Sequence, residues 1–164
     1  MISRSKQSMT KGSVIKIRLQ NFMTYLDETL WPGPSFNCCV GANGSGKSSI
    51  VTALCICLGG DIKNLNRQTD LKSLVNNNSN QSEAIIEVEL YIPKDRNTLV
   101  QCIIFSNGKG LIHKVNGKKV SSEELRRLMD DLQIQPGNDL LNKNDETNFI
   151  SRQVTCVSSC LRML

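Results

Sequence analysis

The chain has 164 residues, of which 39% are hydrophobic and 4% aromatic, and it carries a formal net charge of +5. This size fits one domain or part of one, and no apolar run approaches the roughly 18 residues of a membrane span. The first residues lack the apolar core of a signal peptide, so we expect a protein of the cytosol or nucleus without a membrane partner. The mildly basic balance is compatible with nucleic acid, but an ordinary solvated surface gives the same charge.

The N-terminal quarter is expected to contain an arm followed by three strands. Residues 1–12 are polar and basic, which predicts a disordered arm. From Ser13 onward apolar and polar residues alternate strictly, and this period of two predicts a half-buried antiparallel strand. A second short strand is predicted near residues 27–30. The turn Pro32-Gly33-Pro34 then leads into residues 36–40, a short apolar run typical of a strand that is buried on both faces.

A phosphate-binding motif follows that strand. The pattern G-x-x-x-x-G-K-[ST] occurs as Gly41-Ala42-Asn43-Gly44-Ser45-Gly46-Lys47-Ser48. Its glycines let successive N–H groups turn inward as a nest for phosphate, and the next helix adds the positive end of its dipole. Lys47 would reach the β- and γ-phosphates of a nucleotide, and the Ser48 hydroxyl would hold Mg²⁺. The alternative is a glycine-rich turn without a ligand, which the flanking strand and helix patterns disfavour.

The next elements are a helix and a loop. Residues 48–58 are apolar nearly all round, which predicts a helix that is covered on most sides. Gly59-Gly60 supplies a helix stop, because glycine adopts the left-handed conformation there without steric cost. A polar loop over residues 61–69 carries Arg67. Asp70 then predicts the start of a short helix, which it would cap.

The remaining predicted core is an antiparallel meander and one amphipathic helix. Strands are expected over residues 84–92, 98–105 and 111–115, followed by the hairpin signal Asn116-Gly117. Ser121-x-x-Glu124 is a capping box that opens the helix, which ends before residue 136. A P-loop strand and helix beside an antiparallel meander predict an α/β fold, the half-head of an ABC-type ATPase with a central P-loop strand and a C-terminal helix.

Cysteine and histidine give no metal-site pattern. The seven cysteines lack C-x-x-C spacing, so we expect reduced thiols, with a metal site as the disfavoured alternative. Cys55 and Cys57 lie in the apolar helix, where cysteine behaves as a small hydrophobe. His113 lies in a predicted strand without nearby ligand residues, which indicates a structural role.

Several motifs occur in a fixed order along residues 13–138. They are Asn21-Phe22-x-Thr24-Tyr25, the P-loop with Ser49, Leu58-Gly59-Gly60, Arg67, Asn116-Gly117-Lys118 and Ile134-Gln135-x-Gly137-Asn138. In this order they resemble the N-terminal head segment of structural-maintenance-of-chromosomes (SMC) ATPases. The resemblance implies an ABC-like head that shares ATP and Mg²⁺ with a second head. It also implies the usual partners, the head of the family's protein 6 and a bridging kleisin, and work on chromosomal DNA in recombinational repair in the nucleus.

The resemblance assigns ATP contacts to a defined set of positions. These are Gly41, Ala42, Asn43, Gly44, Ser45, Gly46, Lys47, Ser48 and Ser49, with Arg67 near the nucleotide phosphates. Basic pairs at Lys118-Lys119 and Arg126-Arg127 could contact DNA phosphates in a salt-dependent way, although a solvated face explains each pair as well.

The family pattern stops after Asn138. Residues 139–164 are expected to form a poorly ordered tail without resemblance, although the apolar spacing from Ile150 to Leu164 leaves a short interaction helix as the alternative. Gln153 does not stand in a Q-loop context, and the signature and Walker B motifs do not occur. We therefore expect no ATP hydrolysis by this chain alone. The alternative function is a truncated, non-catalytic product that only engages the partner head or the kleisin, and a stand-alone P-loop kinase is disfavoured.

Overall fold

The computed structural model describes residues 9–34, 37–42, 44–60, 70–108 and 110–134, together with the backbone of 154–156. Its elements are β1 (Val14–Phe22), β2 (Tyr25–Leu30), β3 (Asn37–Cys39), α1 (Lys47–Cys57), the 3-10 helix η2 (Leu71–Leu74), β4 (Glu83–Leu90), β5 (Thr98–Phe105), β6 (Leu111–Val115), β7 (Lys118–Val120), α2 (Ser122–Asp131) and β8 (Val154–Cys156). Within the described ranges, no helix is long and apolar enough to span a membrane.

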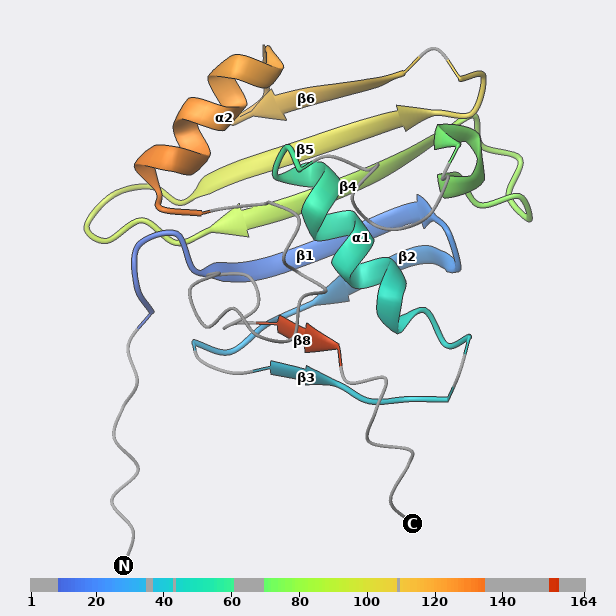
Figure 1. Ribbon diagram of the computed structural model, residues 1–164, viewed down its shortest axis with the longest axis horizontal. Helices are drawn as coiled ribbons and strands as arrows, with labels where there is room; N and C mark the ends of the chain where they lie inside the picture. The colour runs from blue at the N-terminus through green and yellow to red at the C-terminus, as the bar shows by residue number, and fades with distance from the viewer. Residues whose placement is uncertain are drawn as a thin grey trace, which may run out of the picture.

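A six-stranded antiparallel sheet is the larger layer, with the strand order β2-β1-β4-β5-β6-β7 (Figure 1). β4 and β5 pair along their whole lengths, from Glu83 opposite Phe105 to Leu90 opposite Thr98. The predicted meander is therefore present, and it is joined to the two N-terminal strands through β1 and β4. The predicted α/β class with an antiparallel sheet is confirmed.

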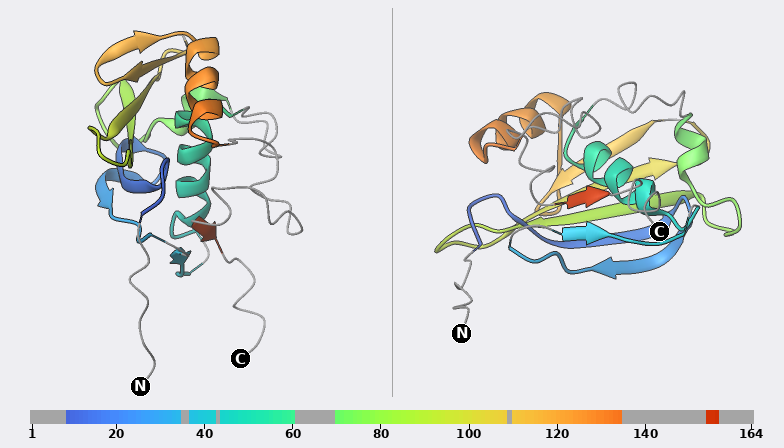
Figure 2. Two further views of the ribbon diagram at one scale, coloured as in Figure 1. Left: turned by 90° about the vertical axis from the view of Figure 1, so that its left-hand side faces the viewer. Right: turned by 60° about the horizontal axis from the view of Figure 1, so that its bottom comes forward.

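One face of this sheet forms the core with α1. Buried and half-buried residues alternate along β4 and β5, as a period of two requires. Leu19, Ile86 and Cys102 are successive cross-strand neighbours on the buried face. Both helices lie on this side of the sheet (Figure 2). The alternation predicted from the sequence thus identifies the face that α1 covers.

Helix α1 is covered nearly all round, as predicted. Every residue from Ser49 to Cys57 is buried. The helix ends in a Schellman motif, in which Gly59 has φ of 84°. The Gly60 N–H donates to the Cys55 carbonyl at 2.8 Å, and the Gly59 N–H donates to the Ile56 carbonyl at 3.2 Å. These two bonds satisfy carbonyls that the end of the helix would otherwise leave unpaired.

His113 joins the sheet to the end of α1, a position consistent with the structural role predicted for it. Its Nε2 lies 2.9 Å from the Ile56 carbonyl oxygen, and the side chain is buried. Burial lowers the pKa of His113 from its ordinary value of 6.5, although the bond to Ile56 opposes this shift. The imidazole therefore favours its neutral form in the folded chain.

The predicted N-caps are confirmed. The Glu124 N–H donates to Ser121 Oγ at 3.2 Å, while the Ser121 N–H donates to Glu124 Oε2 at 2.7 Å, which completes the capping box of α2. Asp70 caps the short helix after the loop, where its Oδ1 accepts from the Lys72 N–H at 3.2 Å, but this element is the 3-10 helix η2.

The last residues of the expected disordered arm, residues 1–12, are held by hydrogen bonds. The Gly12 N–H donates to the Tyr91 carbonyl at 2.8 Å, and Lys11 Nζ donates to the Asp131 carbonyl at 3.3 Å. Residues 1–8 lie outside the described ranges. The last residues of the expected arm are thus tied to the loop after β4 and to the end of α2.

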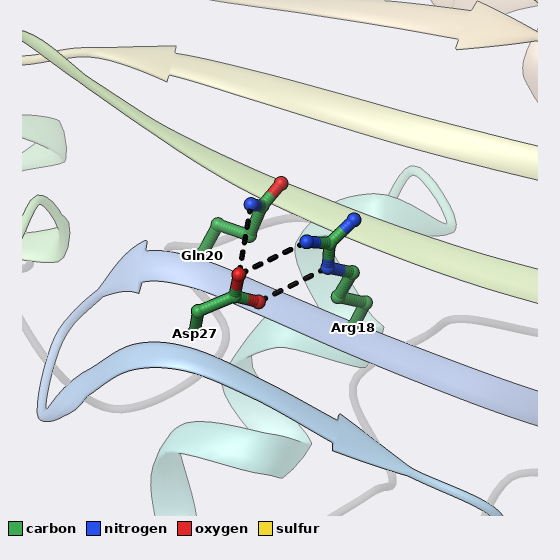
Figure 3. Close-up of polar contacts among 3 residues, drawn as sticks. All are labelled: Arg18, Gln20 and Asp27. Atoms are coloured by element: carbon green, nitrogen blue, oxygen red, sulfur yellow. Dashed lines mark hydrogen bonds and ion pairs between the residues drawn. The ribbon is translucent and has the colours of Figure 1, made fainter.

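The opposite face of the sheet carries no helix among the described residues (Figure 2). Its polar side chains pair across the strands. Arg18 donates from Nε and Nη2 to the two carboxylate oxygens of Asp27 at 3.0 and 2.9 Å, and Gln20 Nε2 donates to the same carboxylate at 3.3 Å (Figure 3). This contact lowers the pKa of the Asp27 carboxyl, and the hydrogen bonds from Arg18 are the main cause.

The strand before the P-loop differs from its prediction. β3 does not enter the six-stranded sheet, but pairs in parallel with β8, with Asn37 opposite Val154 and Cys39 opposite Cys156. Among its described residues, Cys38 is exposed and the following Val40 is 82% exposed, so burial on both faces is wrong here. The reason is that a central parallel strand needs neighbours on both sides, and β3 has one among the described strands.

β8 lies inside the expected tail. Residues 154–156 form a strand, whereas the alternative for this stretch was a helix. The rest of residues 139–164 lies outside the described ranges, and so do the last predicted positions of the head segment, residues 135–138.

Candidate phosphate-binding site

The P-loop lies between β3 and the N-terminus of α1, at the end of the helix away from α2 (Figure 1). Gly41, Ala42 and the run from Gly44 to Ser49 are described, while Asn43 and Arg67 lie outside the described residues. The structure therefore brings together most of the predicted ATP-contacting positions in one loop and first helical turn.

Two glycines give this loop its conformation. Gly44 has φ of 84°, and Gly46 has φ of 92° and ψ of 4°. Both values lie in the left-handed region, which residues with a side chain rarely adopt. The loop closes on itself where the Ser45 N–H donates to the Ala42 carbonyl at 3.2 Å. The backbone geometry thus requires glycine at positions 44 and 46.

The N-terminus of α1 carries positive potential that its own side chains do not neutralise. Gly46 is the N-cap residue and provides no side-chain cap, and the first turn contains no acidic residue. The first N–H groups of a helix have no intrahelical partners, and the helix dipole favours an anion at this end. An anionic group at the start of α1 would therefore be stabilised by both effects.

Lys47 folds back over the loop. Its Nζ donates to the carbonyl oxygens of Gly41 and Ala42, each at 2.6 Å, and the residue is half-buried. These two bonds hold the ammonium group at the base of the loop. A phosphate in the loop would meet a fixed positive charge as well as backbone N–H groups.

The two serines after Lys47 occupy different environments. Ser48 is exposed, and its hydroxyl is a hard oxygen donor of the kind that Mg²⁺ prefers. Ser49 is 3% exposed, and its N–H donates to the Gly46 carbonyl at 2.9 Å. Ser48 thus fits the predicted metal position, whereas Ser49 supports the first turn of the helix. No cluster of three metal-binding side chains occurs in the described part of the chain.

Residues of the β1–β2 turn also reach the P-loop, which the sequence pattern did not indicate. Tyr25 Oη donates to the Gly46 carbonyl oxygen at 3.1 Å. A Cβ at Gly46 would lie 2.7 Å from Thr24 Oγ1 and 2.9 Å from Tyr25 Oη. The signal that could have found them is the motif Asn21-Phe22-x-Thr24-Tyr25, which places both residues directly after β1.

The candidate DNA-contacting residues lie elsewhere. Lys118 and Lys119 lie on β7, and Lys119 stands directly opposite Lys114. Arg127 forms an exposed ion pair with Glu123 at 2.6 Å. α2 and β6 lie at the opposite end of the molecule from the P-loop (Figure 1). The structure therefore does not join these cations to the phosphate-binding loop.

Comparisons with known proteins agree with this geometry. A family model described as an AAA domain matches residues 16–161. Structural maintenance of chromosomes protein 5 of Schizosaccharomyces pombe is 35% identical over 127 residues, which are 77% of this chain and 12% of that protein. The protein of the same name in Arabidopsis thaliana is 31% identical over 155 residues, which are 94% of this chain and 14% of that protein. The chain thus spans a small part of the length of these relatives.

Solved structures show the same fold. A crystal structure of the SmcHead bound to the C-winged helix domain of ScpA has a TM-score of 0.68 and 21% identity, covering 75% of this chain and 41% of that one. A structure of an SMC ATPase described by its ATP-driven dimerization has a TM-score of 0.67 and 23% identity, covering 75% of this chain and 81% of that one. The chain belongs to the AAA domain family, and it has the fold of SMC ATPase heads and resembles SMC protein 5 in sequence.

Proposed function

We propose that this chain is an ATP-binding segment of an SMC head of the protein 5 type, with Mg²⁺ held at Ser48. The observation that carries the proposal is the loop at the start of α1. There Lys47 Nζ sits on the carbonyls of Gly41 and Ala42, beside a helix N-terminus without an acidic residue. This arrangement offers charge and N–H donors to phosphate. When bound, Mg²⁺ would neutralise phosphate charge, and Ser48 would orient the ion through its hydroxyl.

The partners proposed by resemblance are a second SMC head, that of protein 6, and a kleisin. Support comes from one of the structural neighbours, an SmcHead bound to ScpA, and from relatives of this chain that are named SMC proteins 6. The proposed setting is chromosomal DNA in the nucleus, in double-strand-break repair by homologous recombination and in chromosome maintenance. DNA contact through phosphates would use the exposed cations of β7 and α2, and would weaken steeply with salt.

Binding without hydrolysis is the proposed activity of the chain by itself. Phosphoryl transfer needs a positioned water and carboxylate-held Mg²⁺ in addition to a phosphate clamp. The chain supplies the clamp through Lys47 and the loop, while Arg67 is proposed to approach the phosphates. The remaining groups would come from other segments or from the partner head.

Titration of a fluorescent ATP analogue with Mg²⁺ tests this function. We expect saturable binding by the unmodified chain and a loss of at least about tenfold in affinity for Lys47→Ala, because a charge-assisted contact to phosphate is removed. Lys118→Ala is the matched control, since it removes a lysine from the exposed β7 hairpin. Equal binding by the Lys47→Ala and Lys118→Ala variants would refute the proposed site.

A second pair of measurements tests the metal position. Ser48→Ala is expected to reduce the gain in affinity that Mg²⁺ gives over EDTA, while leaving binding in EDTA nearly unchanged. Phosphate release by the unmodified chain, measured in parallel, should stay at background. Turnover that Lys47→Ala abolishes would show that the chain completes its own catalytic site.

A further inference from the structure

We propose that Thr24 and Tyr25, at the turn between β1 and β2, are positioning residues that set the conformation of the phosphate loop at Gly46. The inference rests on the proposed nucleotide site and adds to it two residues outside the P-loop motif. Tyr25 Oη donates to the Gly46 carbonyl at 3.1 Å, and the Ser49 N–H donates to the same oxygen at 2.9 Å. Two donors from different elements therefore fix one carbonyl group.

Fixing this carbonyl also fixes the adjacent N–H. The peptide unit between Gly46 and Lys47 is planar, and the described chain contains no cis peptide, so its N–H points opposite to its C=O. Because Tyr25 and Ser49 hold the Gly46 carbonyl, the Lys47 N–H is directed away from both donors. That N–H belongs to the first residue of α1, where a helix offers its donors to an anion.

Thr24 and Tyr25 also occupy the space beside Gly46. A Cβ at position 46 would lie 2.7 Å from Thr24 Oγ1 and 3.0 Å from the Tyr25 ring carbon that bears the hydroxyl. The turn is thus in direct contact with the glycine backbone. Glycine is required here for two separate reasons, its φ of 92° and the absence of room for a side chain.

The turn itself is held firmly enough to act as a support. Asn21 and Met23 have φ of 53° and 50°, conformations that persist only where the surroundings impose them. The Met23 N–H donates to the Leu74 carbonyl at 2.8 Å. Phe22, which lies between Asn21 and Met23 in the sequence, is fully buried. Asn21 Nδ2 donates to the Glu83 carbonyl at 2.6 Å, and the side chain of Asn21 also bonds to Ser79 Oγ.

These contacts allow Tyr25 to orient the Gly46–Lys47 peptide from a fixed turn. The turn is fixed to η2 and to the start of β4, and the Tyr25 hydroxyl donates from it to the Gly46 carbonyl of the P-loop. Removing that hydroxyl should loosen the Gly46–Lys47 peptide while leaving the turn in place. Nucleotide affinity should then fall because the donor at Lys47 is no longer held in direction.

The test uses the whole chain with Tyr25→Phe, and with Tyr91→Phe as the matched control, since Tyr91 is the other tyrosine in the sequence. Selective labelling with carbon-13 at glycine carbonyls and nitrogen-15 at lysine amides yields one NMR peak for each Gly-Lys peptide. Those peptides are Gly46-Lys47, Gly108-Lys109 and Gly117-Lys118. Affinity for the fluorescent ATP analogue is measured on the same samples.

We expect Tyr25→Phe to shift the Gly46-Lys47 peak alone and to weaken ATP binding by roughly threefold to tenfold, as expected for one lost hydrogen bond. Tyr91→Phe should change neither. An unshifted Gly46-Lys47 peak, or equal displacement of all three peaks, would overturn the inference, because a general disturbance marks an ordinary structural role. So would a shifted peak with unchanged ATP affinity. Failure of the proposed function is separate, since it appears as equal ATP binding with and without the Lys47→Ala change.

Discussion

The six-stranded sheet and the P-loop segment (residues 37–46, Asn43 excepted) are supported in different ways. The sheet packs its alternating apolar residues on α1, and residues such as Leu19, Ile86 and Ile104 are fully buried. The P-loop segment begins with a strand of three residues, whose described partner comes from the far end of the chain. Its Val40 is 82% exposed. Stability thus resides in the sheet, while the phosphate-binding geometry resides in a segment with few buried side chains of its own.

The largest expected effect is a difference in the free energy of unfolding between a substitution in the sheet and one in the P-loop segment. Ile86→Ala removes a fully buried side chain from β4 and should lower the free energy of unfolding by about 2–5 kcal/mol, because it loses apolar burial and leaves a cavity. Val40→Ala should change it by less than about 0.5 kcal/mol, since the side chain is already exposed. Urea denaturation followed by circular dichroism measures both. A loss at Val40 similar to that at Ile86 would show that the P-loop segment shares the core.

A smaller effect depends on pH and is confined to the sheet region. Burial lowers the pKa of His113 in the folded chain, so the unfolded chain binds the proton more readily. Protonation of His113 should therefore not reduce the free energy of unfolding above the unfolded pKa of about 6.5, and should reduce it progressively as the pH falls below that value. Urea midpoints between pH 7.5 and 5.5 should fall less in His113→Gln than in the unmodified chain. An identical decline in both would assign the pH dependence to other groups.

The smallest expected effect is a difference in the reactivity of thiols between the two regions, with no change in stability. Cys38 is exposed on β3, whereas Cys57 and Cys102 are buried between α1 and the sheet. Burial raises the pKa of Cys57 well above its usual value and raises that of Cys102 to about 12, which disfavours the reactive thiolate. Brief iodoacetamide treatment followed by peptide mass spectrometry should label Cys38 well before the other two. Faster labelling at Cys102 would contradict the described core.

The elements with local signals could be predicted from the sequence. Alternation identified the strands of the meander, Gly59-Gly60 marked the end of α1, and Ser121 with Glu124 marked the start of α2. The P-loop was evident because its glycines and lysine stand at fixed spacing. The prediction was wrong where the pairing strand is distant in sequence: the strand before the P-loop was expected to be buried on both faces, but it pairs with β8 and is partly exposed.

The contact between Tyr25 and Gly46 could not be read from periodicity. It joins two turns across the ends of different elements, and a tyrosine in a strand pattern only indicates a half-buried surface. The same limit applies to the pairing of β3 with β8, because parallel strands are joined by long connections whose pairing no short motif specifies.

The Asp27–Arg18–Gln20 contact has a consequence for association between copies of the chain. β2 is the last strand of the sheet order on its side, and its residues Leu26 to Thr29 are exposed. An exposed edge strand is a template for adding another strand. Two copies meeting antiparallel at this edge would bring Asp27 and Glu28 of each copy close to the same acidic pair of the other. Arg18 offsets much of the negative charge of Asp27 through its two hydrogen bonds, so Glu28 contributes most of the repulsion that opposes edge-to-edge pairing of two copies.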